Sequence, residues 1–323
     1  MKQRRERGLC GIAAVLYKVQ AGDERHPVGH QLREMLHAMR HRGVDSTGMT
    51  VCGESFGTDY VARLFVPGAT ATDARPINDA KKAVMGIGGT ISSVSRVDSF
   101  FRVGLDFKGD VRLLADAILA VPGVEIHSIG RSSEIIKDTG DSYELDRRHD
   151  ISGLNGTHGV GHVRLATESQ VDIRHSHPFW AYPFPDISVV HNGQLTNYRT
   201  LTRKLEQKGY RFQTHNDSEV IGVYIADKLS QGVSLSDALE QSLDDLDGTF
   251  TYVVTTDSGI GVAKDRWSAK PFVIFDTPEL VALASEEVAL RRIFPENVER
   301  FEPQEHMVLT WDVALAPVIG RRS

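Results

Sequence analysis

The sequence predicts an α+β protein built as a layered sandwich of sheets and helices. Strand-like segments cluster at both ends of the 323-residue chain, and helical patterns lie between them. The sustained alternation of strand and helix that marks a doubly wound parallel sheet is missing. Hydrophobic residues make up 41% and charged residues 25% of the chain, as in an ordinary folded globular protein.

Short apolar runs carry the strand predictions. Residues 11–17 (GIAAVLY) form the first, and a hairpin is expected where Asp257-Ser258-Gly259 separates two later runs. The further strands are expected at 159–167, 186–193, 249–256, 260–265, 271–275, 280–285 and 306–311.

Apolar residues at helical spacing predict the helices. Leu32, Leu36 and Met39 recur at i, i+4 and i+7, and this helix closes near Gly43. Three later helices are expected at 194–208, from a cap at Asp217 or Ser218 through Leu229, and at 234–246.

The pattern indicates a single domain at 10–315, preceded by a leader or propeptide at 1–9. A mis-assigned translation start is the other explanation of the leader. Residues 53–155 form a poorly readable insertion, in which only a helix near 110–120 and a strand at 124–129 stand out.

Charge and cysteine content narrow the classes of function. The formal net charge of −6 provides no basic surface for nucleic acid or anionic lipid. No apolar run approaches the roughly 20 residues that cross a bilayer. Cys10 and Cys52 are the only cysteines and form no CxxC pair, which fits a reduced cytoplasmic protein better than a disulfide framework or a cysteine-rich zinc site.

Four short segments occur in a fixed order along the chain. They are Cys10-Gly11-Ile12, 41–48 (HRGVDSTG), 161–167 (GHVRLAT), and His191-Asn192-Gly193 with 216–219 (NDSE) downstream. In this order they resemble the class II glutamine amidotransferases, and the likeness weakens only between about 53 and 120. The resemblance implies a four-layer αββα sandwich of the N-terminal-nucleophile hydrolase type.

A narrower likeness comes from two longer stretches. The segment from Ser128 through 156–169 (GTHGVGHVRLATES) and residues 244–254 (DDLDGTFTYVV) are similar to stand-alone amidotransferase subunits of the glutamate synthase and N-methylglutamate synthase type. This resemblance implies glutaminase activity, with ammonia passed to a separate, flavin-containing partner subunit.

Cys10 is the candidate nucleophile. A thiol with a pKa near 8.5 is mostly protonated at neutral pH, so attack on an amide needs a base. A free α-amino group, with a pKa of about 7.7–8.0, can take the thiol proton, whereas a peptide nitrogen cannot. If Cys10 is the nucleophile, residues 1–9 must be absent from the active enzyme. The alternative is that Cys10 is a small buried residue on a core strand.

Asn192 and Gly193 are the candidate oxyanion donors. The Asn192 side-chain amide and the Gly193 backbone N–H can both donate to the oxyanion that forms when a carboxamide is attacked. The alternative is an Asn-Gly turn, the commoner structure of this dipeptide.

The remaining site residues come from the family resemblance. It implies that Arg164 binds the α-carboxylate of L-glutamine, that Asp217 binds its α-ammonium, and that Thr167 lines the same pocket. Arg42 and Asp45 are expected to support the strand of the nucleophile rather than to contact substrate. Arg164 can instead be a surface charge, and Asp217 a helix cap.

No metal or cofactor is expected. The 13 histidines lack an HExxH pattern or a cysteine-containing ligand set, and no glycine-rich nucleotide motif occurs. Two other functions stay open at this point: an N-terminal-nucleophile amidase acting on another amide, and a catalytically silent regulatory subunit of the same fold.

Overall fold

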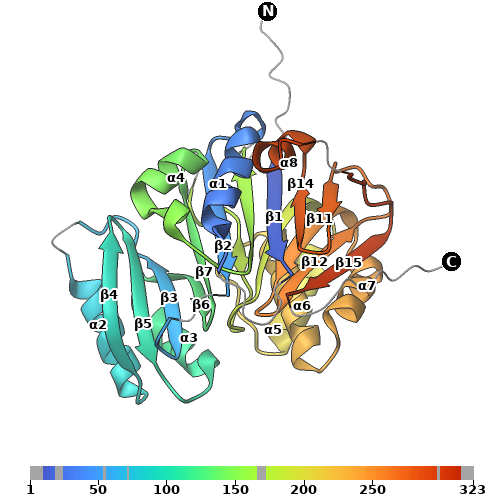
Figure 1. Cartoon of the computed structure of the whole chain (residues 1–323). Coiled ribbons are helices and arrows are strands. Elements are labelled where there is room, and N and C mark those ends of the chain that lie inside the picture. Colours follow the sequence, from blue (N-terminus) through green and yellow to red (C-terminus); the bar gives the residue numbers. More distant parts are fainter. Residues whose placement is uncertain are drawn as a thin grey trace, which may run out of the picture.

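The structure, a computed structural model, contains three antiparallel sheets and the helices that cover them (Figure 1). It describes residues 10–18, 25–53, 56–70, 73–165, 172–296 and 299–313. The expected leader at 1–9 therefore lies outside the described residues.

The first sheet has six strands and carries the start of the described chain. Its order is β13 (Val273–Asp276), β14 (Leu280–Ala284), β1 (Gly11–Tyr17), β8 (His158–Arg164), β2 (Ser46–Cys52) and β7 (Ser133–Thr139). β1 lies inside this sheet and pairs with β14 on one side and β8 on the other. This position explains its nearly continuous apolar sequence, because both faces and both edges of the strand are covered.

The second sheet packs face to face on the first. Its order is β15 (Met307–Asp312), β12 (Gly259–Lys264), β11 (Gly248–Thr255), β10 (Ser188–Leu195) and β9 (Phe179–Trp180). Ile12 and Leu16 of β1 belong to the same buried cluster as Val190 of β10 and Val253 of β11. The alternate residues of β1, Ala13 among them, belong to a cluster on the opposite face of the sheet.

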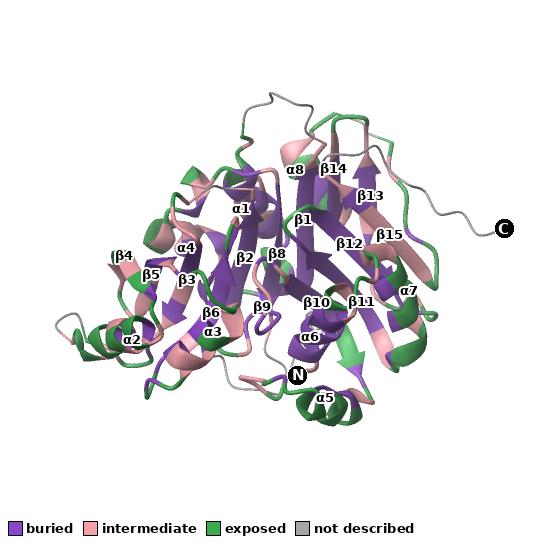
Figure 2. Ribbon diagram, turned by 90° about the horizontal axis from the view of Figure 1, so that it is seen from below, coloured by how far each residue is buried: buried purple, intermediate pink, exposed green. Residues whose placement is uncertain are grey.

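Helices cover the outer face of each sheet. The first sheet is covered by α1 (Val28–Ala38), α4 (Ser142–His149) and α8 (Glu287–Ile293), and the second by α5 (Tyr198–Gln207), α6 (Asp217–Ser230) and α7 (Leu235–Asp245). Short 3₁₀ turns lie at η1 (Arg40–Arg42) and η2 (Ile151–Gly153). The order of layers is helix, sheet, sheet, helix, which confirms the predicted αββα sandwich. Figure 2 shows most strands of the two central sheets, and α6 beside them, as buried, whereas the edge strand β15 is mostly intermediate.

A third sheet forms a lobe beside the sandwich (Figure 1). Its order is β4 (Thr90–Val97), β5 (Phe100–Asp106), β3 (Tyr60–Phe65) and β6 (Glu125–Gly130), with α2 (Arg75–Gly86) and α3 (Val111–Leu119) packed on it. Leu64, Val84, Val103 and Leu114 are among the residues of its own core. The helix expected near 110–120 and the strand at 124–129 correspond to α3 and β6. The other elements of the lobe were not predicted.

Two local expectations were wrong. The helix expected from residue 194 begins at Tyr198, because Gln194 and Leu195 continue β10 and pair with β11. The cap of the next helix is neither Asp217 nor Ser218. It is Asn216, whose side chain accepts the Ser218 backbone N–H at 2.9 Å.

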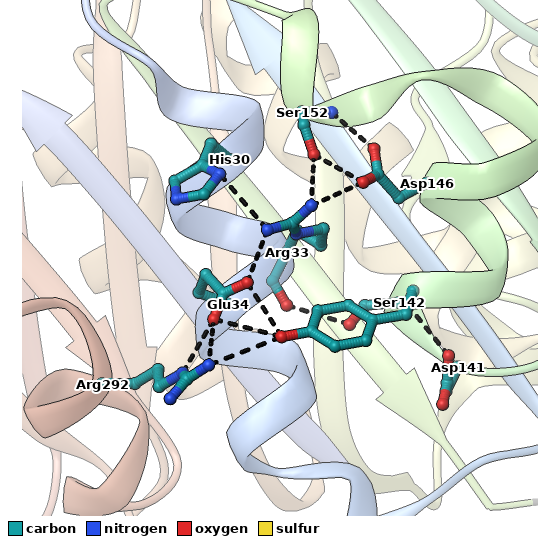
Figure 3. Close-up of polar contacts among 9 residues, drawn as sticks. His30, Arg33, Glu34, Asp141, Ser142, Asp146, Ser152 and Arg292 are labelled. Carbon is teal, nitrogen blue, oxygen red and sulfur yellow. Dashed lines mark hydrogen bonds and ion pairs between the residues drawn. The ribbon is translucent and has the colours of Figure 1, made fainter.

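A network of charged residues ties the three helices over the first sheet together (Figure 3). Arg33 of α1 donates to Asp146 of α4 at 2.6 Å and to Ser152 at 2.7 Å. Glu34 of α1 accepts from Arg33 at 2.6 Å and from Arg292 of α8 at 2.7 Å. The network fixes the helical layer that covers β1. Within the described part of the chain, no helix is long and apolar enough to cross a membrane.

Candidate active site

Cys10 immediately precedes β1 and is half-buried. Gly11, the first residue of the strand, pairs with Val163 of β8. The Cys10 Sγ faces the carbonyl oxygen of Leu165, just beyond the end of β8, at 3.9 Å. The thiol is therefore held at one end of the first sheet without being enclosed in the core.

Two side chains from distant segments donate to the Cys10 carbonyl oxygen. Arg42 Nε lies 3.1 Å from this oxygen, and Asn192 Nδ2 lies 3.0 Å from it. Arg42 is buried and also forms an ion pair with Glu286, the residue that precedes α8. Arg42 and Asn192, which are 32 and 182 residues away from Cys10 in the sequence, thus meet at its main chain.

Asn192 and Gly193 lie inside β10, where they pair with Thr251 and Phe250 of β11. The Asn-Gly turn considered above is therefore absent. Gly193 has a φ of +149°, and a Cβ on it would lie 2.0 Å from the Thr249 carbonyl oxygen. Only glycine fits this position without a shift of the backbone.

Besides its contact with Cys10, the Asn192 side-chain amide contacts His162 through its oxygen and Ser285 through its nitrogen. Its Oδ1 lies 3.0 Å from Nε2 of His162, and its Nδ2 lies 3.3 Å from Oγ of Ser285. Burial holds the pKa of His162 at about 3, so this imidazole is neutral at physiological pH. The Ser285 hydroxyl also accepts the Ile12 N–H at 2.9 Å, which links the amide to the start of β1.

Asp217 is the first residue of α6 and binds the end of β10. Its Oδ2 accepts the Leu195 backbone N–H at 2.8 Å, and its Oδ1 lies 3.7 Å from His191 Nδ1. Burial alone would raise the pKa of Asp217. The contacts with His191 and Leu195 outweigh it and hold the pKa below the ordinary value, so the carboxylate is ionised near neutral pH.

Arg164 and Asp45 lie at the edge of this group. Arg164 is the buried last residue of β8, directly before Leu165, and its carbonyl oxygen accepts the Asp45 backbone N–H at 3.1 Å. Thr167 lies outside the described residues. Cys10, Arg42 and Asn192 are thus in direct contact, whereas Arg164 and Asp217 join them through neighbouring main-chain groups.

The histidines near the site gather without forming a metal centre. His177 and His191 both contact the Ser218 hydroxyl at 2.9 Å, and the His162 and His177 rings lie 4.1 Å apart. Among the residues that the structure describes, no group of three or more His, Cys, Asp or Glu side chains is arranged to hold a metal ion.

Comparisons with known proteins concern the family and the fold of the chain. A family model described as a glutamine amidotransferase domain matches residues 162–292. A candidate glutamine amidotransferase of Methanothermobacter thermautotrophicus is 40% identical over 308 residues, which cover 92% of this chain and 98% of that protein. The chain belongs to the class II glutamine amidotransferase family. This amidotransferase is also 34% identical over 305 residues to the glutamine amidotransferase-like protein GlxB of Rhizobium meliloti, covering 94% of the chain and 98% of that protein.

A solved structure supports the fold of the amidotransferase. The glutamine phosphoribosylpyrophosphate amidotransferase of B. subtilis, solved in complex with ADP and GMP, matches with a TM-score of 0.58 over 95% of this chain. The identity is 18%, so the likeness concerns the fold alone. The match covers 50% of that chain, so the amidotransferase spans about half the length of this solved relative.

Three contact residues of the amidotransferase site were not predicted to take part in it: His162, Ser285 and Glu286. His162 lies within the GHVRLAT segment, but its neighbour Arg164 was assigned a role and His162 was not. Ser285 and Glu286 follow an apolar strand that looks like plain core in the sequence. Their partners are separated from them by 93 residues or more, so no local spacing could have identified them.

Proposed function

We propose that this amidotransferase hydrolyses L-glutamine to L-glutamate and ammonia, with Cys10 as the nucleophile. The observation that supports this best is the convergence on Cys10, where Arg42 and Asn192 both donate to its carbonyl oxygen while its thiol stays half-buried. Two polar side chains directed at the main chain of one cysteine serve to orient that residue, which a cysteine that only fills the core does not need.

The reaction needs a free amino group on Cys10. The α-amine takes the thiol proton, and the Sγ then forms a bond to the side-chain carbonyl carbon of glutamine. The tetrahedral oxyanion accepts hydrogen bonds from Asn192 Nδ2 and the Gly193 N–H. When the carbon–nitrogen bond breaks, the α-ammonium returns its proton and ammonia leaves. Water then hydrolyses the γ-glutamyl thioester and releases glutamate and the free thiol.

Asn192 has to exchange one contact in this step. Its Nδ2 carries two hydrogens, which face Cys10 O at 3.0 Å and Ser285 Oγ at 3.3 Å. The longer contact is the weaker one, and we propose that the oxyanion replaces it.

The ends of the substrate require opposite charges. We assign the α-carboxylate of glutamine to Arg164 and its α-ammonium to Asp217, with Thr167 and Gly193 along the pocket. The lowered pKa of Asp217 suits this role, because an ionised carboxylate is needed to bind an ammonium group. Arg42 and Asp45 support the nucleophile and do not contact substrate in this scheme.

The test compares two forms of the protein, the full chain and the chain that begins at Cys10. The second form should hydrolyse glutamine, and its Cys10→Ala variant should be inactive. The full chain should gain activity only when intact-mass analysis shows that residues 1–9 have been removed. Full glutaminase activity in protein that retains these residues would defeat the mechanism. Activity on other amides but not on glutamine would show that the protein is a different amidase. If both forms of the protein are inactive, the result would indicate a regulatory subunit.

We further propose that the ammonia passes to a separate, flavin-containing subunit of the glutamate synthase type in the cytoplasm. This rests on the likeness of residues 244–254 and of the 128–169 region to such subunits. Both cysteines are free thiols in the structure, which suits a reducing compartment. Because coupling between sites is reciprocal, the isolated chain should be a slow glutaminase that accelerates when partner and acceptor substrate bind. Co-purification from native extract, with assays on separated and recombined fractions, checks this. A partner-free chain that is already fully active would contradict it.

A further inference from the structure

His162 and Asn192 face each other across the two central sheets. His162 lies on β8 of the first sheet and Asn192 on β10 of the second. His162 Nε2 lies 3.0 Å from Asn192 Oδ1, and both side chains are buried. The contact joins residues 30 positions apart in the sequence, on the side of the amide opposite to Cys10.

The neighbours of Asn192 determine which way its amide points. The Cys10 carbonyl oxygen can only accept a hydrogen bond, so the atom 3.0 Å from it must be the NH₂ group. The Asn192 oxygen then faces His162, whose Nε2 must carry a proton to donate. Since His162 is neutral, its one ring proton is on Nε2. Among the described residues its Nδ1 has no hydrogen-bond partner, which agrees with this tautomer.

We infer that His162 is a positioning residue for the glutaminase reaction, which keeps the Asn192 amide turned with its NH₂ group toward Cys10. The inference rests on the proposed role of Asn192 as an oxyanion donor. The terminal torsion of asparagine is broad and roughly two-fold, so rotation is not prevented by the side chain itself. Without the His162 donor, a rotated amide would place its oxygen beside the Cys10 carbonyl and the developing oxyanion, where it repels both.

His158 provides a matched control. It lies four residues before His162 on the same strand and therefore on the same face of the sheet. It is also fully buried, but its Nε2 contacts the Thr256 carbonyl oxygen at 2.8 Å instead of Asn192. Replacing either histidine removes a buried imidazole from β8, and only one replacement removes the contact with the amide.

The experiment is a double-mutant cycle on kcat and KM for glutamine in the active protein. His162→Leu should lower kcat about tenfold with little change in KM, since one hydrogen bond to a transition-state donor is lost. His162→Gln should recover most of the rate, because its side-chain amide can donate from about the position of Nε2. His158→Leu should leave kcat within about twofold of the parent. In the Asn192→Ala background, His162→Leu should have no further effect.

Each other result counts against the inference. If His162→Leu lowers kcat equally with and without the Asn192 amide, or if His162→Gln recovers nothing, His162 acts otherwise and the inference fails. If Asn192→Ala lowers kcat while His162→Leu does not, the inference about His162 fails, and the proposed oxyanion role of Asn192 stands. If Asn192→Ala has no effect, the proposed oxyanion role falls, and the inference with it. Should His162→Leu not fold, His162→Asn, whose shorter side chain does not reach Asn192, replaces it in the cycle.

Discussion

Gly193 shows at the scale of a single residue how the site restricts its sequence. The residue is exposed and lies in a regular strand, yet its φ is +149° and the space for a Cβ is taken by the Thr249 carbonyl oxygen. The restriction comes from the backbone of β11, which cannot move without disturbing its pairing with β10. A side chain at this position would displace the strand that carries Asn192.

Gly193→Ala should therefore destabilise the protein by about 1–3 kcal/mol through overpacking and backbone strain. It should also lower glutaminase activity, because Asn192 is the preceding residue. The free energy of unfolding from denaturant titration measures the first effect. Gly232→Ala is the matched control, since Gly232 also has a positive φ, +82°, but nothing lies within 4 Å of its Cβ position. Equal losses in the two variants would show that the contact with Thr249 is unimportant.

The role of a residue in the site could be predicted from the sequence only where the residue lies in a recognisable motif. Cys10, Asn192 and Arg42 stand in recognisable segments, and the structure brings these three together. The contacts of His162 and Ser285 with Asn192 depend on the stacking of two sheets, which no spacing along the chain encodes. A histidine in such a segment gives no local sign of the residue that it will face.

At the scale of elements, the helical layer over the first sheet depends on the carboxylate of Glu34. Burial favours its neutral form, but hydrogen bonds from Arg33, Arg292 and Tyr143 outweigh burial and lower the pKa of Glu34. These donors lie on α1, α8 and α4, so one side chain holds three helices together (Figure 3). The layer as a whole supports the strand that begins beside Cys10.

Glu34→Gln should lower the free energy of unfolding by about 1–3 kcal/mol at pH 7. Because the folded pKa lies below the unfolded value, the stabilisation is complete above about pH 4.3 and is lost as the pH falls through the folded pKa. The difference between parent and variant should therefore shrink at pH 3, as chemical denaturation at the two pH values can measure. Asp79→Asn, which breaks an exposed pair with Lys82, should change stability by less than about 1 kcal/mol at either pH. A parent–variant difference that is constant with pH would contradict this account.

Element boundaries failed where tertiary pairing overrides the local pattern. Gln194 and Leu195 suit a helix, yet β11 offers them ladder partners in Thr249 and Gly248, and they stay extended. The capping residue was misplaced by one position, because Asn, Asp and Ser in a row are all good caps. Only the fold shows that the Asp217 carboxylate accepts a hydrogen bond from the Leu195 backbone N–H.

At the scale of the whole molecule, the family resemblance predicted the αββα sandwich. The poorly readable residues 53–155 contain the lobe of β3–β6 and also β7 and α4 of the sandwich. The sandwich strand β1 is apolar on both faces and stands out in the sequence. β4 is mostly exposed and polar, so its sequence carries no strong strand signal. The boundaries of the single domain at 10–315 and its insertion stay a prediction.

The central claim is that Cys10, freed at its amino group, is the nucleophile. Reaction of the active protein with a diazoketone analogue of glutamine, followed by intact-mass analysis and peptide mapping, tests this most directly. We predict one label per chain, on the Cys10 thiol of a polypeptide that begins at that residue, with glutamine protecting against it. Cys52, which is fully buried and whose thiol pKa is raised by burial, should stay unmodified. A label on Cys52 with Cys10 untouched, or a label on Cys10 in active protein that retains residues 1–9, would contradict the account.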